Sequence, residues 1–407
     1  MLRSPALRLL LPALIACSSS SVIGNATPAT SEPVVEPSTT LSQVDPQDVT
    51  VVYPLPASAA EAERMLKGTS VGAFGELVPR EAFGRIAEPL DARSKGPVGA
   101  AGEPARLGLH LVAVRLDPCF GVEGKESVCK AQMRLVFQGM GGTGDGPKPA
   151  ADDGAVHVFV EMPQAELVRT VKQVLTLREK AGGYAAAPLG VHPVLEREGL
   201  GGAFAQGLRS IVLEHGGASR VTRMTFFRRT NSRQGQWIFG IFDAKSGAFA
   251  ESPIATTTAT TQTLVAGIAP SGQGLAGRVE NPTSSPDDMT LLLDTAKATS
   301  APREDFAKAV RAAERVENPR FHSPDTMDCV SCHTATAALR VSAQNSAGGD
   351  AYRTSGGKIP AYAAPAAPSL ENVHALSYLG SELGINQRTA NESHSVTVAV
   401  NALLAKP

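Results

Sequence analysis

The sequence is poor in aromatic side chains and in net charge. Phe, Trp and Tyr make up 5% of its 407 residues, with a single Trp, and the formal net charge is −1 at pH 7. A near-neutral balance provides no electrostatic footprint for nucleic acid or for an anionic membrane surface. We therefore expect no nucleic-acid partner. The hydrophobic fraction of 43% is ordinary for a globular protein.

An apolar run long enough to cross a bilayer is also missing from the sequence. The first segment comes closest, because Arg3 and Arg8 precede a short apolar run over residues 9–16 that ends at Cys17. This order is typical of a leader that is removed on export. We therefore expect the mature protein outside the cytoplasm, even if Cys17 follows an ordinary secretory leader by coincidence.

The four residues Leu14-Ile15-Ala16-Cys17 resemble the lipobox of bacterial lipoproteins. The resemblance implies a lipoprotein signal segment over residues 1–17, cleavage before Cys17 and diacylglycerol on the Cys17 sulfur. Ser18 follows, and in the sorting rule of this family a residue that is not acidic there favours the outer membrane. The implied location is the cell envelope, on the outer membrane and facing the periplasm, with membrane contact through the lipid anchor.

Composition and periodicity divide the rest of the chain into three parts. Residues 18–45 are rich in Ser, Thr, Pro and Glu and predict a disordered tether. Residues 46–290 combine clustered alternating runs, such as 107–116 and 132–138, with helical patterns such as 163–180, which predicts an α+β domain with an antiparallel sheet. Residues 291–407 predict a smaller, mainly helical region, with helices over 302–316, 370–379 and 391–404.

Cysteine is scarce, with five in the chain. Cys119 and Cys129 lie between the two alternating runs that predict a strand pair. In an oxidising compartment we expect these two to form a disulfide that closes the hairpin and stabilises it by about 2–4 kcal/mol. Two free structural thiols are the alternative.

Two further cysteines form the motif Cys329-Val330-Ser331-Cys332-His333. Disulfide exchange is one chemistry for such a pair, but that motif usually follows a strand of a βαβ unit, which the preceding residues do not predict. Zinc binding by His322 together with the motif is another, but the adjacent side chains of Cys332 and His333 diverge. Covalent haem is the third, because thiols one helical turn apart match two vinyl groups of a porphyrin.

This motif resembles the haem-attachment site of c-type cytochromes at every required position. The resemblance implies one covalent haem c on Cys329 and Cys332, with His333 as the proximal iron ligand. Together with the leader, the chain resembles a bacterial outer-membrane lipoprotein that carries a single such motif. It implies a cytochrome c-like haem-binding region over residues 291–407.

The sixth iron ligand is less defined by the sequence. Met327 is the last methionine and lies too close to Cys329 to reach the opposite face of a haem. His374 is the first candidate, because it falls on the packed side of the predicted helix 370–379, and His322 is the alternative. His394 is predicted to face solvent, and an open or unusual sixth site is the last alternative. His110 and His157 lie in predicted strands and are interpreted as structural.

These features predict a non-catalytic electron carrier with an unidentified redox partner protein. Two other hypotheses remain. One is a haem-based sensor or ligand binder with an open sixth site, and the other is a structural envelope lipoprotein whose motif carries no haem.

Overall fold

The computed structural model describes residues 43–84, 108–118, 130–141, 150–230, 235–245, 247–267, 274–345, 361–363 and 369–406. All of them belong to one compact unit, Thr39–Pro407. Cys17, the predicted tether up to residue 42, and the cysteines of the predicted Cys119–Cys129 disulfide lie outside the described residues. Val44 is buried and Asp45 caps the first helix, so these two residues belong to the folded unit.

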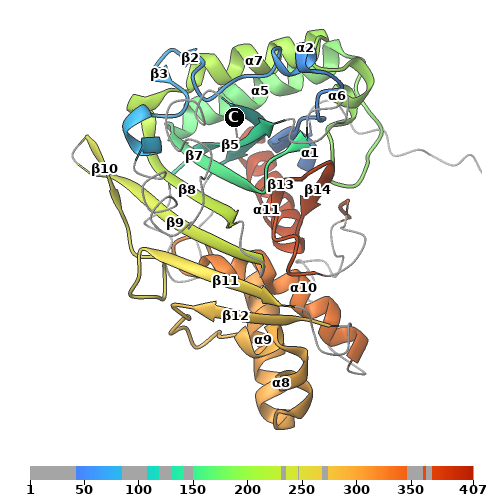
Figure 1. Ribbon diagram of the computed structural model, residues 1–407. Helices are drawn as coiled ribbons and strands as arrows, with labels where there is room; N and C mark the ends of the chain where they lie inside the picture. The colour runs from blue at the N-terminus through green and yellow to red at the C-terminus, as the bar shows by residue number, and fades with distance from the viewer. Residues whose placement is uncertain are drawn as a thin grey trace, which may run out of the picture. The chain divides into compact units, whose positions relative to one another are not determined.

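The fold is a mixture of helices and strands with a large antiparallel sheet, as the sequence predicts, and this sheet has ten strands within the described residues (Figure 1). The main path runs β1-β4-β5-β7-β8-β9-β11-β12, with β6 beside β5 and β10 beside β9. Its strands are β1 Thr50–Val52, β4 Leu109–Asp117, β5 Gln132–Gly141, β6 Ala150–Ala151, β7 Gly154–Glu161, β8 Val221–Thr230, β9 Gly235–Lys245, β10 Ala248–Glu251, β11 Thr261–Gly267 and β12 Ala276–Glu280.

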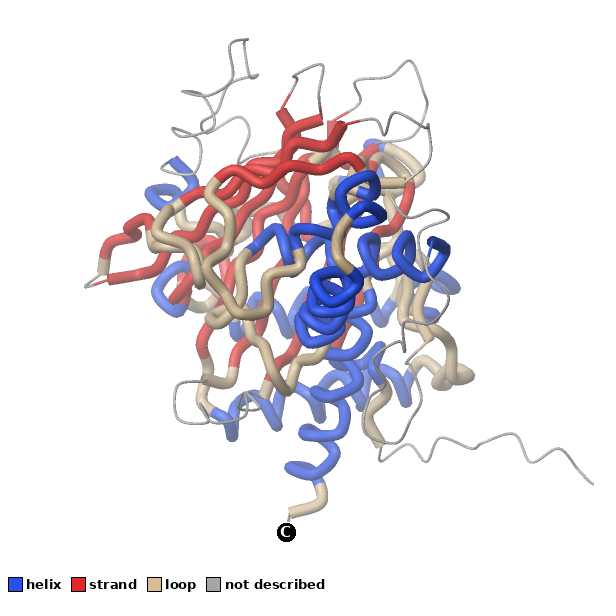
Figure 2. The backbone as a smooth tube through the Cα atoms, turned by 90° about the horizontal axis from the view of Figure 1, so that it is seen from below, coloured by secondary structure: helices blue, strands red, loops and turns tan. Residues whose placement is uncertain are grey.

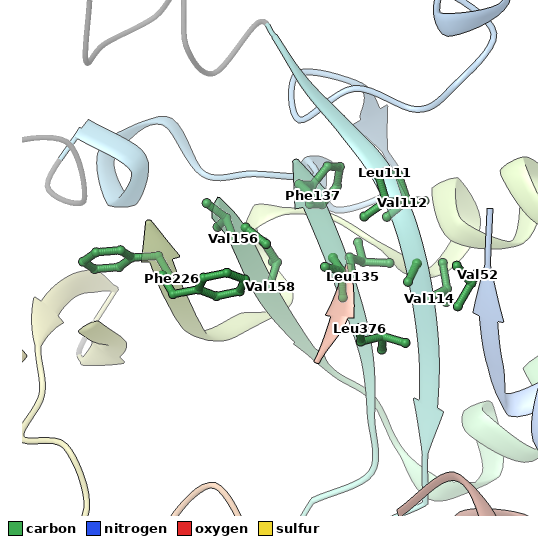
Figure 3. Close-up of a cluster of buried hydrophobic side chains, with 14 of the residues drawn as sticks. Val52, Leu111, Val112, Val114, Leu135, Phe137, Val156, Val158, Phe226 and Leu376 are labelled. Atoms are coloured by element: carbon green, nitrogen blue, oxygen red, sulfur yellow. The ribbon is translucent and has the colours of Figure 1, made fainter. Parts of the chain in front are cut away.

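The predicted strand pair 107–116 and 132–138 is confirmed as β4 and β5, which pair antiparallel. Side chains alternate across a sheet, so Met133 and Leu135 point to one face of β5 while Arg134 and Gln138 point to the other. A large apolar core contains residues of both faces. Figure 3 shows part of that core, with valine, leucine and phenylalanine side chains of β4, β5, β7 and β8.

Two long helices, α5 (Gln164–Lys180) and α7 (Ala203–His215), pack against each other on the Met133 side of the sheet (Figure 1). The predicted helix 163–180 is thereby confirmed, and Leu167, Val171 and Val174 are buried on its inner face. Short elements complete this part of the chain: α1 Pro46–Val49, α2 Ala59–Ala62, β2 Val71–Gly72, β3 Gly75–Glu76, α6 Pro193–Glu198 and the 3-10 turn η1 Ala218–Arg220.

The residues after 290 pack on the sheet face that carries Arg134. They form the 3-10 turn η2 Thr290–Leu293, α8 Thr295–Ser300, α9 Arg303–Glu317, α10 Cys329–Asn345, β13 Leu376–Leu379, β14 Glu382–Ile385 and α11 Gln387–Leu404. Figure 2 shows the strands as one layer with the helices packed against it. Among the described helices, none is both long and apolar enough to cross a bilayer.

The predicted helix 370–379 is wrong, because this segment is extended and ends in the hairpin β13–β14. The side chain of Gln138 on β5 donates to the carbonyl of Tyr378 (2.8 Å) and accepts from its N–H (2.7 Å). These two bonds replace the hydrogen bonds that a helix would have given Tyr378. Gly380 follows with φ +58°, a backbone conformation that favours glycine and permits the turn.

Candidate functional site

The cysteine–histidine motif forms the first turns of α10. Asp328 begins this helix, because its carboxylate accepts from the N–H of Ser331 (3.0 Å). Gln262 on β11 donates to the same carboxylate (2.9 Å) and accepts from the N–H of Val330 (2.9 Å). The start of the motif helix is therefore fixed directly to the sheet.

All three chemical groups of the motif face one cavity. Cys329, Cys332 and His333 are each half-buried, and the exposed part of each lines this space between the sheet and the C-terminal elements. The sheet, the segment before α10, the hairpin and α11 supply the other walls, through Arg115, Arg134, His157, Phe159, Arg223, Thr225, Phe226, Phe227, Phe239, Ile241, Pro324, Met327, Asp328, Ala375, Leu376, Arg388, Thr389 and Glu392.

The orientation of His333 is set by a backbone carbonyl. Its Nδ1 lies 2.7 Å from the oxygen of Val373, which makes Nδ1 the protonated nitrogen and leaves the Nε2 lone pair unused by this contact. Burial lowers the pKa of His333, and the bond to Val373 partly opposes that shift. A neutral imidazole whose Nδ1–H donates to a carbonyl is the usual form of a metal-binding histidine.

The two thiols of the motif are free. Burial raises the pKa of Cys329 well above its usual value, and the nearby charges of Asp328 and Cys332 add to that effect. Burial likewise raises the pKa of Cys332, to about 11. Thiols with raised pKa values are protonated at neutral pH and are poor nucleophiles for disulfide exchange.

His374 lies beside this site but does not line the cavity. It is buried just before β13, where its Nδ1 hydrogen-bonds Ser377 Oγ (2.7 Å) and its Nε2 has no partner among the described residues. Burial lowers the pKa of His374 to about 3, with a further contribution from His333. The centroid of the Phe227 ring lies 4.9 Å from that of the His374 ring and 5.0 Å from that of the His333 ring. Phe227 therefore packs against both imidazoles.

The remaining predicted candidates lie away from the cavity. His322 is buried, with Nε2 2.9 Å from a carboxylate oxygen of Asp287 and Nδ1 3.4 Å from Thr326 Oγ1. Both of its nitrogens are thus engaged outside the motif. His394 is half-buried on α11 and lines a different cavity with Asp45. No group of three or more His, Cys, Asp or Glu side chains suited to a metal ion occurs within the described ranges.

His157 is interpreted as a structural residue from the sequence, and its place in the wall of this cavity was not predicted. His157 lies on β7, lines the cavity, and has a buried Nε2 without a partner in the part of the chain that is described. Burial lowers the pKa of His157 well below its usual value, and the charges of Arg134, His333 and His374 act in the same direction. The register of β7 against β5 places His157 on the face of Arg134, and the pattern of β7 alone does not contain that information.

The lining brings together the kinds of side chain that a covalently attached haem would use. One wall supplies two thiols and an imidazole with an available nitrogen, and the sheet wall supplies His157 together with the aromatic surfaces of Phe227 and Phe239. A polar nitrogen buried without a partner is costly, and a metal bond is one way to satisfy it.

Comparisons with protein-family models, with curated proteins and with solved structures gave no match.

Proposed function

We propose that the protein is an envelope electron carrier with one covalent haem c. The observation that carries the proposal is the convergence of Cys329, Cys332 and His333 on one cavity, with the His333 ring oriented by Val373. The two thiols would hold the haem through thioether bonds, and His333 would be the proximal ligand. When bound, the haem would supply a one-electron couple. The protein would bury the haem and hold in place the histidine nitrogens that bind its iron.

Two histidines are candidates for the sixth iron position. His157 is supported best, because it lines the cavity on the sheet wall and its Nε2 lacks a partner among the described residues. His374 also has a buried Nε2 without a partner in the described part of the chain, but it lies outside the cavity lining. His322 is supported least, because Asp287 and Thr326 occupy its two nitrogens.

The proposed setting is the outer membrane, facing the periplasm, with Cys17 as the lipid anchor and a separate protein as the redox partner. The leader motif described above supports this part of the proposal. The near-neutral net charge supports the absence of a nucleic-acid partner.

A pyridine haemochrome assay tests the central proposal. The full chain is produced together with the machinery that attaches haem c, purified under denaturing conditions and assayed. We expect one haem for each chain. A protein without haem would overturn the proposal and favour the structural envelope lipoprotein.

The second candidate function is a haem-based sensor or ligand binder with an open sixth site. This function is favoured by the position of His374 outside the cavity lining. If His374 is not an iron ligand, the sixth position is filled only when His157 binds there. Absorption spectra of the reduced protein with and without carbon monoxide separate the two functions. An electron carrier with two axial histidines stays unchanged, whereas an open site binds the gas.

A further inference from the structure

Two arginines stand directly opposite each other on the sheet wall of the cavity. Arg115 on β4 and Arg134 on β5 are register partners in the antiparallel pair. Their side chains point to the same face, and they are only 1% and 8% exposed. Like charges directly opposite in a sheet are destabilising, and burial increases the cost because water no longer screens them.

The hydrogen bonds of these arginines are incomplete. Arg115 Nη1 donates to Glu392 (2.7 Å), but its Nε and Nη2 are buried with no partner among the described residues. The same holds for Nε of Arg134, whose guanidinium lies over the ring of Phe159, 4.6 Å from its centroid. Each unpaired N–H buried in this way carries an unrecovered desolvation cost.

The charges around the pair do not balance. Arg388 on α11 is a further buried arginine next to the pair, and it shares Glu392 with Arg115. Burial lowers the pKa of Arg134, and the charge of Arg115 lowers it further, while Glu392 and Asp117 oppose that shift. In this immediate group of described side chains, the three arginines Arg115, Arg134 and Arg388 outnumber the two carboxylates Glu392 and Asp117 by one.

The other charged side chains on the cavity are already committed. Arg223 is paired with Asp243 and Asp325. The carboxylate of Asp328 accepts from Gln262 and from the N–H of Ser331. Within the described residues, no hydrogen bond or ion pair joins Asp243, Asp325 or Asp328 to Arg115 or Arg134.

We infer that Arg115 and Arg134 form a binding site for an anionic oxygen group, a carboxylate or an oxyanion. Guanidinium groups suit such groups because their N–H donors match two oxygens at once. The ligand chemistry has two sources. One is the propionate carboxylates of the proposed haem, which rests on the proposed function, and the other is a free oxyanion that enters the cavity.

The first arm of the test uses the full chain without haem and does not depend on the proposed function. Inorganic phosphate and succinate are titrated at constant ionic strength, and the thermal midpoint is followed. We expect saturable stabilisation of the wild type and an apparent affinity about tenfold weaker or worse in Arg134→Met. Arg278→Met, at an exposed arginine of β12, is the matched control and should behave as the wild type.

The second arm measures the effect of Arg134→Met on the thermal midpoint in the haem-free and in the haem-loaded protein, and compares the signs of the two effects. Without haem or added anion, Arg134→Met removes the repulsion from Arg115 and should be neutral or raise the thermal midpoint. With haem attached, the same change should lower the midpoint if propionates occupy the site. If the haem-loaded wild type still responds to phosphate, the occupant is a free oxyanion.

The inference fails if the haem-free wild type shows no saturable response to either anion. It also fails if Arg134→Met and Arg278→Met respond alike. A chain that takes up no haem but binds phosphate through Arg134 would overturn the proposed function and leave the anion site standing.

Discussion

The backbone oxygen of Val373 lies 2.7 Å from Nδ1 of His333. The segment before β13 therefore fixes the orientation of the His333 imidazole. Val373 is adjacent to His374 in the chain and belongs to the same buried layer. His333 and the segment that leads into the hairpin are therefore one structural unit. A substitution that moves the segment before β13 should therefore also change the orientation of the His333 ring.

The double substitution Cys329→Ala with Cys332→Ala should abolish covalent haem. Both thioether bonds depend on these sulfurs, whereas export depends on the leader. Haem staining after denaturing electrophoresis measures the loss, and an immunoblot of the envelope fraction confirms that the protein is exported. Persistent stain in the double variant would contradict the assignment of the motif.

If His333 and His157 hold the iron of the proposed haem, the ferric wild type should be low-spin. His157→Ala should convert it fully to a high-spin form that binds carbon monoxide when reduced. His394→Ala is the matched control and should leave the spectrum unchanged, because His394 lies on a different cavity.

His374→Ala decides between the two candidate ligands. If His374→Ala becomes high-spin while His157→Ala keeps the wild-type spectrum, His374 is the ligand and Phe227 has to give way when haem binds. A high-spin wild type would instead favour the sensor function.

Cys17→Ala should prevent lipidation and the processing that follows it. The protein is then expected as an uncleaved precursor or in the soluble fraction. Membrane fractionation and intact-mass measurement check this outcome, with Ser18→Ala as the control that keeps the cysteine. Normal processing and outer-membrane recovery of Cys17→Ala would exclude the lipid as the anchor.

Glu317→Gln should stabilise the protein at high pH. Burial raises the pKa of Glu317 to about 7, although the bond from Thr336 and the charges of Arg340 and Arg388 oppose the shift. Because the folded state binds this proton more tightly than the unfolded state, stability falls as pH rises from about 4.5 through about 7.

The substitution removes that loss. We expect a gain of about 1–3 kcal/mol in the free energy of unfolding at pH 8 relative to the wild type, and little difference at pH 4.5. Urea unfolding across this range measures it. Glu304→Gln, exposed on the same helix, is the control. An equal effect at both pH values would refute the role of the Glu317 proton.

The sequence predicted the elements whose pattern is local. The alternating runs that became β4 and β5 and the apolar face of α5 each carry their signal within a few turns of chain. The prediction of a helix over 370–379 is wrong because the structure of this segment depends on Gln138. Gln138 lies far away in the chain and binds both backbone groups of Tyr378. No local pattern contains that contact.

The same distinction holds for the site. The Cys329–His333 motif is contiguous and could be recognised in the sequence, whereas the opposite wall is assembled from separate strands. The pairing of Arg115 with Arg134 is a matter of register, and the position of His157 follows from the next strand across. A shift of one residue in register would have turned these side chains to the other face.

The beginning and end of the folded unit are joined by Asn401, whose side-chain amide accepts from the N–H of Val44 (2.8 Å) and donates to its carbonyl (3.1 Å). β1, which follows closely, completes one edge of the sheet against β4. Contacts between such distant parts of a chain form late in folding, because the loop they close is long. We therefore expect the edge strand and the last helix to come together late in folding. If the chain is exported and receives haem as proposed, the motif segment would remain accessible to the attaching enzymes during that interval.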